Sequence, residues 1–200
     1  MPPSEIIRLP QPRFAGPVSV EQTLLARRSV RTYARDPLTV DDLTQLLWAA
    51  QGVTHSQGYR TAPSAGALYP LELYTVVGHM VGLPAGLYRY GGREHALERR
   101  HPRDLRSELC AAALNQRPVE RAPVTFLLTA VYDRMTAKYG SRGVRYVDME
   151  AGHAAQNLCL QAVALDLKSV VIGAFHDGEV KRIAMLPADE EPLYLVPVGR

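Results

Sequence analysis

Lys138 and Tyr139 stand side by side, directly before Gly140 and close to several arginines. An amine or a phenol in a dry cleft transfers protons near neutral pH when neighbouring charges shift its pKa. Segment 137–146, AKYGSRGVRY, also has the polar, glycine-containing composition of a solvent-exposed turn. From these residues alone the turn is the favoured interpretation, and the pair is a candidate for proton transfer.

Three arginines and a serine, Arg27, Arg28, Ser29 and Arg31, follow a helical pattern that begins near Ser19. Arg27 and Arg31 are four residues apart, so we expect them to share one helix face. Guanidinium groups bind phosphate oxygens through paired N–H donors, and the cluster therefore suits a phosphate. Cations at the end of a helix also stabilise the negative end of its dipole, and both interpretations remain open.

Small residues crowd into segment 61–70, TAPSAGALYP. Such residues let the backbone approach a flat ligand closely and point its N–H groups at it. The large apolar residues that follow at once are unusual for a plain surface turn. The alternative is a tight turn that leads into a strand at Leu71.

Two Glu-x-x-His pairs, Glu150–His153 and Glu98–His101, match the ligand spacing of di-iron bundles. That site needs both pairs on facing helices and two further carboxylates, whereas His101 lies in a hairpin-like segment beside arginines that repel a cation. We therefore predict no metal site. We expect the polar residues of the later helix to form a satisfied hydrogen-bond network in a core or at a subunit interface: Glu150, His153, Gln156 and Asn157.

The sequence lacks GxGxxG, GxxxxGK[ST] and GxSxG. It therefore shows no dinucleotide-binding motif, no P-loop and no hydrolase nucleophile elbow. The 200 residues are 46% hydrophobic and 22% charged, and 23 basic against 20 acidic residues give a net charge of +3. Acidic residues are interleaved with the basic ones, which argues against a nucleic-acid partner. No run reaches the roughly 20 apolar residues of a membrane span, and no signal sequence begins the chain, so we expect a cytoplasmic protein.

The elements that must position these residues alternate without a regular βαβ rhythm, which predicts an α+β fold in one domain, 20–200. Residues 1–19 hold five prolines and predict an extended arm over the core or a partner. Helices are expected after Ser19, from Thr39 as N-cap to Gly52, over DLRSELCAAALNQ, and over 145–167. Strands are expected at LELYTVVG, at the hairpin GLYRYGG–HALERR, and at three buried runs: PVTFLLTAVY, SVVIGAF and PLYLVPVG.

Taken in order, RRSVRTY, PSAGALYPLELY, and EAGHAAQNLCLQAVAL followed by VIGAF resemble the nitroreductase superfamily. The SagB-type, azoline-oxidising branch is the nearest match, and the resemblance runs from about residue 20 to the end. It implies a central, mostly antiparallel sheet flanked by helices, in an interlocked homodimer with FMN at the subunit interface. Many nitroreductases have Asn where this chain has Ala67, which favours the azoline branch.

The resemblance also implies which residues hold the cofactor. Arg27, Arg28, Ser29 and Arg31 would bind the FMN phosphate, ribityl chain and pyrimidine edge, and Arg200 would replace the family's basic C-terminal segment. The other subunit would supply Pro63, Ser64, Ala65 and Ala67. Asn115 or Gln116 would reach the flavin ring, and Gly173 and Ala174 would present backbone N–H groups near N5.

In the azoline-oxidising branch a Lys-Tyr pair acts on the substrate, which here would be Lys138–Tyr139. The implied reaction is FMN-dependent dehydrogenation of a thiazoline or oxazoline, in a peptide or a small molecule, to the azole. One alternative is an NAD(P)H-dependent reductase of nitroaromatics or quinones. Another is a catalytically silent flavin-binding protein that scaffolds a cyclodehydratase complex.

Overall fold

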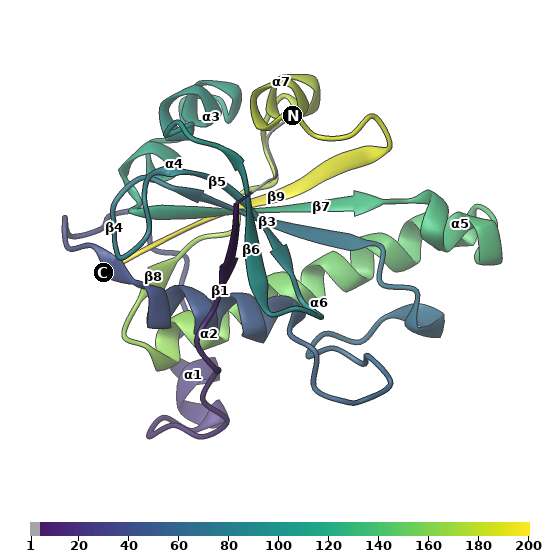
Figure 1. Cartoon of the computed structure of the whole chain (residues 1–200), viewed down its shortest axis with the longest axis horizontal. Coiled ribbons are helices and arrows are strands. Elements are labelled where there is room, and N and C mark those ends of the chain that lie inside the picture. The colour runs from purple at the N-terminus through teal and green to yellow at the C-terminus, as the bar shows by residue number, and fades with distance from the viewer. Residues whose placement is uncertain (1–4) are drawn as a thin grey trace.

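The computed structural model describes residues 5–200 and is built around one seven-stranded sheet in which all neighbouring strands are antiparallel (Figure 1). The strand order is β1-β6-β5-β3-β7-β9-β8. Their bounds, in that order, are Ile6–Arg8, Ala96–His101, Gly86–Gly91, Leu71–Val77, Val124–Val131, Glu190–Gly199 and Lys168–Ser169.

Helices cover both faces of this sheet (Figure 1). On one face lie α1 (Val20–Ala26), α2 (Val40–Gln51) and the long α6 (Arg142–Ala164). On the other lie α3 (Arg106–Ala112), α4 (Pro118–Arg121) and α7 (Asp177–Ala184). The remaining elements are a small parallel pair, β2 (Leu38–Thr39) with β4 (Met80–Val81), the short helix η1 (Ala65–Ala67), and α5 (Asp133–Tyr139). The expected α+β fold, with a large antiparallel sheet flanked by helices, is confirmed.

Strand β7 is the centre of the molecule, as its continuous apolar sequence predicts. All eight of its residues are buried, and it pairs with β3 on one side and β9 on the other. Side chains alternate along a strand, so Phe126 and Leu128 enter the core under α2 and α6. Leu127 enters the separate core under α3, α4 and α7.

Two helices, α1 and α2, begin at residues whose hydroxyl groups cap the helix. Thr39 caps α2 and Ser19 caps α1, and each hydroxyl accepts a hydrogen bond from the backbone three residues on. In both cases the side chain of that third residue, Asp42 or Gln22, accepts the N–H of the cap in return. Such reciprocal caps satisfy two N–H groups that the first turn leaves free. The predicted start of α2 at Thr39 and its end at Gly52 are confirmed.

Three expectations about local structure need correction. Helix α1 ends at Ala26, so Arg27 and Arg31 do not share a helix face. SVVIGAF is not a continuous strand, because only Lys168–Ser169 is strand and Ile172 forms an isolated bridge. The helix predicted over 145–167 spans Arg142–Ala164 instead.

The N-terminal arm contributes to the sheet, since β1 pairs with β6 at the sheet edge. Further along, the backbone of Arg13 donates to and accepts from the side chain of Gln45 on α2, at 2.8 and 2.9 Å. Phe14 packs beside Trp48, with ring centroids 5.5 Å apart. Pro2 and Pro3 lie outside the described residues. Within the described part, none of the helices is long and apolar enough to cross a membrane.

Candidate functional site

The loop 61–70 and the Lys138–Tyr139 pair meet at Gly66. A Cβ atom at this glycine would lie 2.6 Å from the Tyr139 hydroxyl and 2.9 Å from Lys138 Nζ. The φ angle of Gly66 is +62°, a conformation that side chains with a Cβ atom rarely adopt. The structure therefore brings together two segments that the sequence singled out separately.

The backbone of this loop is strained beyond Gly66. Ala67 and Tyr69 also have positive φ values, +56° and +48°. Residues without glycine's freedom cost free energy in this region and persist where the surroundings fix them, often at functional sites. Strain of this kind is frequent in binding segments, and positive φ values also occur in tight turns such as the one that leads into β3 at Leu71, so both interpretations of the loop stay open.

Lys138 and Tyr139 occupy the last turn of α5, which Gly140 ends with φ +57°. The Tyr139 ring packs edge-on against the Tyr146 ring of α6, with centroids 5.2 Å apart. Lys138 Nζ lies 5.4 Å from the centre of the Tyr139 ring. Lys138 is exposed and Tyr139 is half-buried. The pair ends a helix, and the turn predicted from local sequence begins only after it.

An ion-pair network holds α5 against the loop. Arg134, one turn before Lys138, pairs with Glu72 at 2.7 Å and donates to the Tyr69 carbonyl at 3.2 Å. Glu72 also pairs with Arg89 at 2.8 Å, and its side chain is only 11% exposed. A largely desolvated carboxylate with two guanidinium partners holds its geometry better than an exposed ion pair. Sequence reasoning missed these three residues, because nothing in their local pattern joins them.

Beneath the loop, polar contacts link it to α6. Asn157 donates to the Thr61 carbonyl at 3.3 Å, and the Ser64 hydroxyl accepts the Tyr69 N–H at 2.9 Å. Glu150 lies in the same region and is only 2% exposed. Burial raises the pKa of its carboxyl to about 7, although Ser64 and a nearby guanidinium act in the opposite direction.

The network expected for the polar residues of α6 is only partly present. Neither carboxylate oxygen of Glu150 has a hydrogen-bond partner, and His153 and Gln156 are exposed. Only Asn157 makes the kind of contact that was expected. Among the described residues no cluster of three or more possible ligands could hold a metal ion.

The arginine cluster lies at another part of the molecule. The chain turns out of α1 and runs beside the residues that follow α6: Val30 N–H donates to the Ser169 carbonyl at 3.0 Å. The guanidinium of Arg28 donates to the carbonyls of Leu25 and Arg27, at 3.0 and 2.7 Å. This contact agrees with the helix-dipole interpretation for Arg28. Arg31 is exposed.

Arg200 already has a partner in the chain. Its guanidinium pairs with Asp42 at 2.9 Å, and its carbonyl accepts the N–H of Ala34 at 2.7 Å. The C-terminus therefore lies beside the arginine segment. Because Asp42 of α2 partly neutralises the Arg200 guanidinium, this side chain would attract a phosphate less strongly than a free arginine would.

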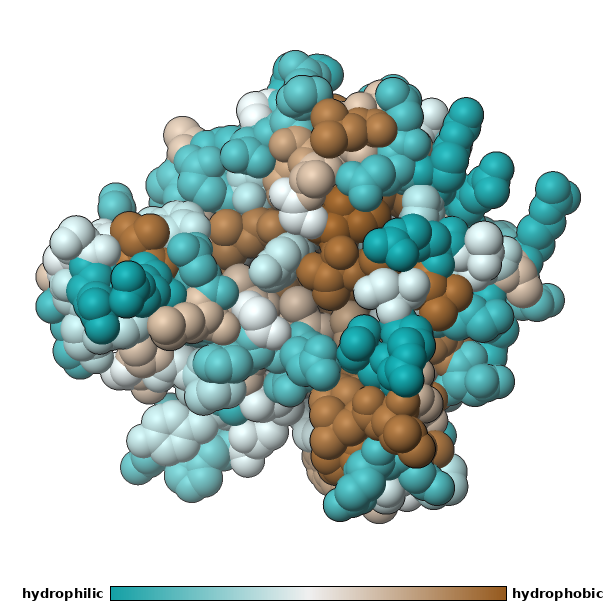
Figure 2. All heavy atoms as spheres, turned by 180° about the vertical axis from the view of Figure 1, so that it is seen from behind, coloured by the Kyte–Doolittle hydropathy of each residue, from teal (hydrophilic) through white to brown (hydrophobic). Residues whose placement is uncertain are grey.

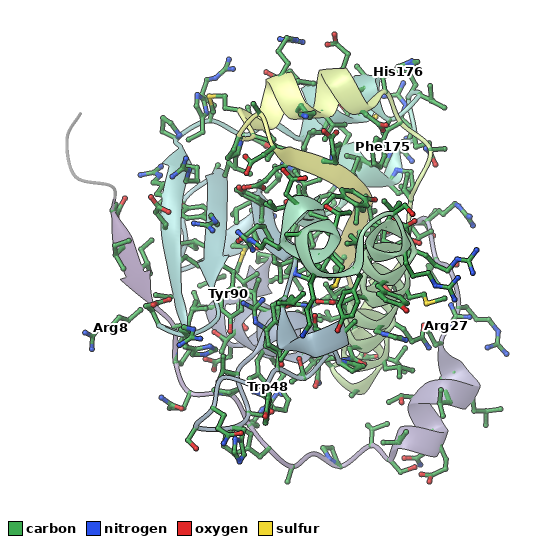
Figure 3. All side chains as sticks on the ribbon, turned by 90° about the vertical axis from the view of Figure 1, so that its right-hand side faces the viewer. Arg8, Arg27, Trp48, Tyr90, Phe175 and His176 are labelled. Carbon is green, nitrogen blue, oxygen red and sulfur yellow. The ribbon has the colours of Figure 1, made fainter. Side chains whose placement is uncertain are left out.

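The third group of expected cofactor residues comes together at the end of α3. Gln116 donates to the Ala174 carbonyl at 2.8 Å, which joins the 115–116 segment to the 173–174 segment. Asn115 has a φ of +60° and is exposed, as are Gly173 and Ala174. Exposed backbone at this point is available to a ligand. In Figure 3, Arg27 lies on the same side of the molecule as Phe175 and His176, which follow Ala174.

Within one chain the loop 63–67 and the arginine cluster are separate. The loop lies near Glu150, whereas Arg27 lies near Cys159, nine residues further along α6. That interval is about 14 Å along a helix axis and half a revolution around it. In residues 5–200 no hydrogen bond or ion pair joins the two groups. The structure thus keeps these two groups of expected cofactor residues apart within the chain.

Comparison with known proteins identifies the family. The family model described as "Nitroreductase family" matches residues 24–200. The chain belongs to the nitroreductase family. A Methanocaldococcus jannaschii protein named as a nitroreductase is 46% identical over 92% of this chain and 91% of its own length. Members of this family are oxidoreductases, and this chain is therefore assigned to that class.

Two more distant relatives come from Rhizobium leguminosarum bv. trifolii. The trifolitoxin operon protein TfxC is 23% identical over 88% of this chain, and the trifolitoxin-processing protein TfxB is 30% identical over 65%. This chain spans only 54% and 38% of their lengths.

Solved structures share the fold. A Ralstonia eutropha protein named as a nitroreductase superposes with a TM-score of 0.84 at 31% identity, over 98% of this chain and 89% of that one. The Escherichia coli microcin synthetase McbBCD complex has a chain with a TM-score of 0.75 at 23% identity, covering 95% and 76%. The NADPH:FMN oxidoreductase of Vibrio harveyi gives 0.66 at 21%, covering 90% and 68%. The last two likenesses concern the fold alone.

Proposed function

We propose that this nitroreductase-family protein is an FMN-dependent oxidoreductase that dehydrogenates a thiazoline or oxazoline ring to an azole. The observation that carries the proposal is the meeting of Lys138 and Tyr139 at Gly66, in a strained loop of small residues. A nitroreductase fold supplies a flavin site, and this pair adds groups that can move a substrate proton beside it.

The residues present suit FMN. Arg27, Arg28 and Arg31 are cations close to one another, which fits a phosphate. The exposed backbone at Gly173 and Ala174 can face a flat ring. The Vibrio harveyi neighbour, named as an FMN oxidoreductase, supports the same cofactor. When bound, FMN supplies a two-electron acceptor for hydride.

A homodimer would complete the site, with the arginine cluster from one protomer and the loop 63–67 from the other. The separation of the two groups along α6 supports this arrangement. So does α1, whose apolar residues Val20, Leu24 and Leu25 are 65%, 54% and 76% exposed. Figure 2 shows apolar atoms gathered on the projecting part of the molecule that α1 forms. Contiguous exposed apolar surface marks an interaction site, and a second copy would bury it.

In this proposal some residues of the chain bind the cofactor and others move the substrate proton. The arginines and the 173–174 backbone hold the cofactor, and Gly66 leaves room for the substrate-facing ends of Lys138 and Tyr139. As hydride leaves one ring carbon of the azoline, Lys138 or Tyr139 accepts the proton from the neighbouring carbon. Both electrons of the broken C–H bond leave with the hydride, and a ring double bond forms from the electrons of the deprotonated carbon.

One relative is named as a trifolitoxin-processing protein and another as a trifolitoxin operon protein, and the microcin synthetase complex that shares the fold has truncated pro-MccB17 bound. These names favour a substrate that is part of a peptide. Work within a cyclodehydratase complex is then part of the proposal. The second candidate is an NAD(P)H-dependent reductase of nitroaromatics or quinones, which the 46% identity to a protein named as a nitroreductase favours.

One experiment separates the candidates. The protein is loaded with FMN and offered, in parallel, a thiazoline-containing peptide in air and NADPH with a nitroaromatic. The proposal expects the peptide to lose two hydrogen atoms, as measured by mass spectrometry. Rapid NADPH consumption with nitroaromatic turnover and no change in the peptide would favour the second candidate. Flavin binding without either activity would point to the scaffold role.

A further inference from the structure

Glu150 is the most deeply buried acidic side chain of α6, and the division of roles above leaves it without one. Glu150 is 2% exposed, and neither carboxylate oxygen has a partner in hydrogen-bond geometry, although the Ser64 hydroxyl lies close enough to lower the carboxyl pKa. A buried carboxylate without partners is costly, and such a group lowers the cost by holding a proton. Its pKa, raised to about 7 by burial, agrees with this behaviour.

The polar groups around Glu150 come from the loop above it. Ser64 uses its oxygen to accept the Tyr69 N–H, so its hydroxyl proton is free to be donated. Arg60 is the charged group that acts on Glu150 from the loop, and it lowers the carboxyl pKa. Its guanidinium lies 4.5 Å over the Tyr69 ring and donates to Gln51 at 2.7 Å, so it makes no ion pair with Glu150 in this arrangement.

Arg60 has charged neighbours of its own on other elements. Glu72 of β3 and Arg134 of α5 influence the pKa of Arg60, in opposite directions. From its own helix, Glu150 is followed one turn later by His153, which is exposed. The charged group that acts on the Glu150 carboxyl, Arg60, therefore belongs to the segment that leads to Gly66.

We propose that Glu150 is a positioning residue whose protonation state sets the conformation of residues 60–67, and thereby the place of Gly66 against Lys138 and Tyr139. With the carboxyl neutral, Arg60 stays on Tyr69 and Gln51, as the structure shows. With the carboxyl ionised, the Ser64 hydroxyl and the Arg60 guanidinium turn toward it, because both stabilise the charged form. The loop moves with them, and solvent supplies or takes up the proton.

This inference rests on the proposed function only in assigning the loop to a flavin site. Two readouts keep the two claims apart. The first is the thermal unfolding of flavin-free protein as a function of pH, which needs no cofactor. The second is the dissociation constant of FMN, from quenching of its fluorescence. If FMN does not bind at all, the proposed function fails while the first readout still tests the protonation of Glu150.

The test compares wild type with Glu150→Gln, which is neutral at every pH, and with His153→Gln as a matched control on the same helix. FMN has its own titration, so the ratio of dissociation constants, wild type to variant, is taken at each pH. For Glu150→Gln we expect a ratio near one at about pH 6, rising about tenfold by about pH 8. His153→Gln should give a ratio that does not change with pH.

Ser64→Ala keeps Glu150 but removes the hydroxyl that couples it to the loop. We expect the stability of this variant still to fall with rising pH, but at a higher pH than in wild type, because the hydroxyl no longer stabilises the ionised carboxyl. We expect the variant to lose most of the pH dependence of FMN binding. A pH-independent ratio for Glu150→Gln would overturn the inference. If Glu150→Gln does not fold, a wild-type FMN profile in Ser64→Ala would overturn it instead.

Discussion

Gly66 and Tyr139 approach so closely that a Cβ atom at Gly66 would lie 2.6 Å from the Tyr139 hydroxyl. The contact ties the loop expected to face the flavin to the residues expected to face the substrate. Because the crowded atoms are the ends of flexible side chains, a methyl group here would displace the pair and leave the core in place. The positive φ of Gly66 adds a backbone cost of about 1 kcal/mol for any other residue.

Gly66→Ala should therefore lose much more activity than stability. We expect turnover to fall about 10²-fold, the cost of misplacing a catalytic group by about 1 Å. Gly82→Ala is the matched control, since Gly82 has a φ of +83° far from the pair. Thermal unfolding should shift similarly in both variants, whereas turnover should fall in Gly66→Ala alone. Equal turnover in the two variants would show that the contact has no role in catalysis.

Lys138→Ala and Tyr139→Phe should keep FMN and lose azoline oxidation. Removing a positioned acid–base group costs about 10²–10⁴ in rate. Tyr139→Phe keeps the ring that packs against Tyr146, so its fold should be unchanged. Tyr59→Phe, at an exposed tyrosine, serves as the control and should retain full activity. Loss of flavin from Lys138→Ala would place this residue in the cofactor site instead.

Arg31→Ala should weaken FMN binding by about ten- to a hundredfold, the worth of one hydrogen bond to a charged group. Its stability should not change, because the side chain is exposed. Arg28→Ala should weaken binding too and also destabilise α1, since its guanidinium donates to two carbonyls at the helix end. Arg35→Ala, also exposed, is the control. Titration of flavin-free protein with FMN measures each constant, and excess FMN should restore activity to both variants.

Leu25→Asp should convert a dimer into monomers. Leu25 is 76% exposed on α1, and a charge in the centre of an apolar interface opposes association. Val81→Asp changes an exposed apolar residue elsewhere, 58% exposed, and should leave the mass unchanged. Light scattering gives the mass directly. FMN affinity should fall together with dimer content, and a Leu25→Asp monomer that binds FMN normally would contradict a shared site.

The stability of flavin-free protein should fall as the pH rises from about 5 to about 8. Glu150 has a pKa of about 7 when folded and an ordinary pKa of 4.5 in an unfolded chain, so the folded state holds a proton that the unfolded chain loses. The protonated carboxyl contributes its full stability below about pH 4.5; this contribution falls as the pH rises between the two values and is lost above about pH 7. The loss should be on the order of 2 kcal/mol after allowance for relaxation around the charge. Glu150→Gln should remove this slope, as measured by chemical unfolding at several pH values.

Local chemistry made some elements predictable. Thr39 and Asp42 form a cap whose two halves lie three residues apart, so the start of α2 can be seen in the sequence. The continuous apolar run of β7 likewise required burial on both sides. In each case the signal and the structure that it determines lie within a few residues.

Other features depend on contacts between distant segments. The helical pattern after Ser19 does not indicate that Val30 pairs with Ser169. Because the chain pairs there, the arginines lie after the end of α1 and not within it. Likewise, the sequence around Glu150 shows a polar residue in a helix but not whether it finds a partner. The ion pair between Arg134 and Glu72 joins α5 to β3, and no pattern in the sequence around either residue indicates it.

The most direct test of the central claim measures azole formation and bound FMN in the same samples of wild type and Lys138→Ala. A thiazoline-containing peptide is the substrate, and loss of two hydrogen atoms is followed by mass spectrometry. The account predicts equal FMN content in both proteins and conversion at least about 10²-fold slower in Lys138→Ala. Equal conversion rates, or no conversion by wild type that is fully loaded with FMN, would contradict it.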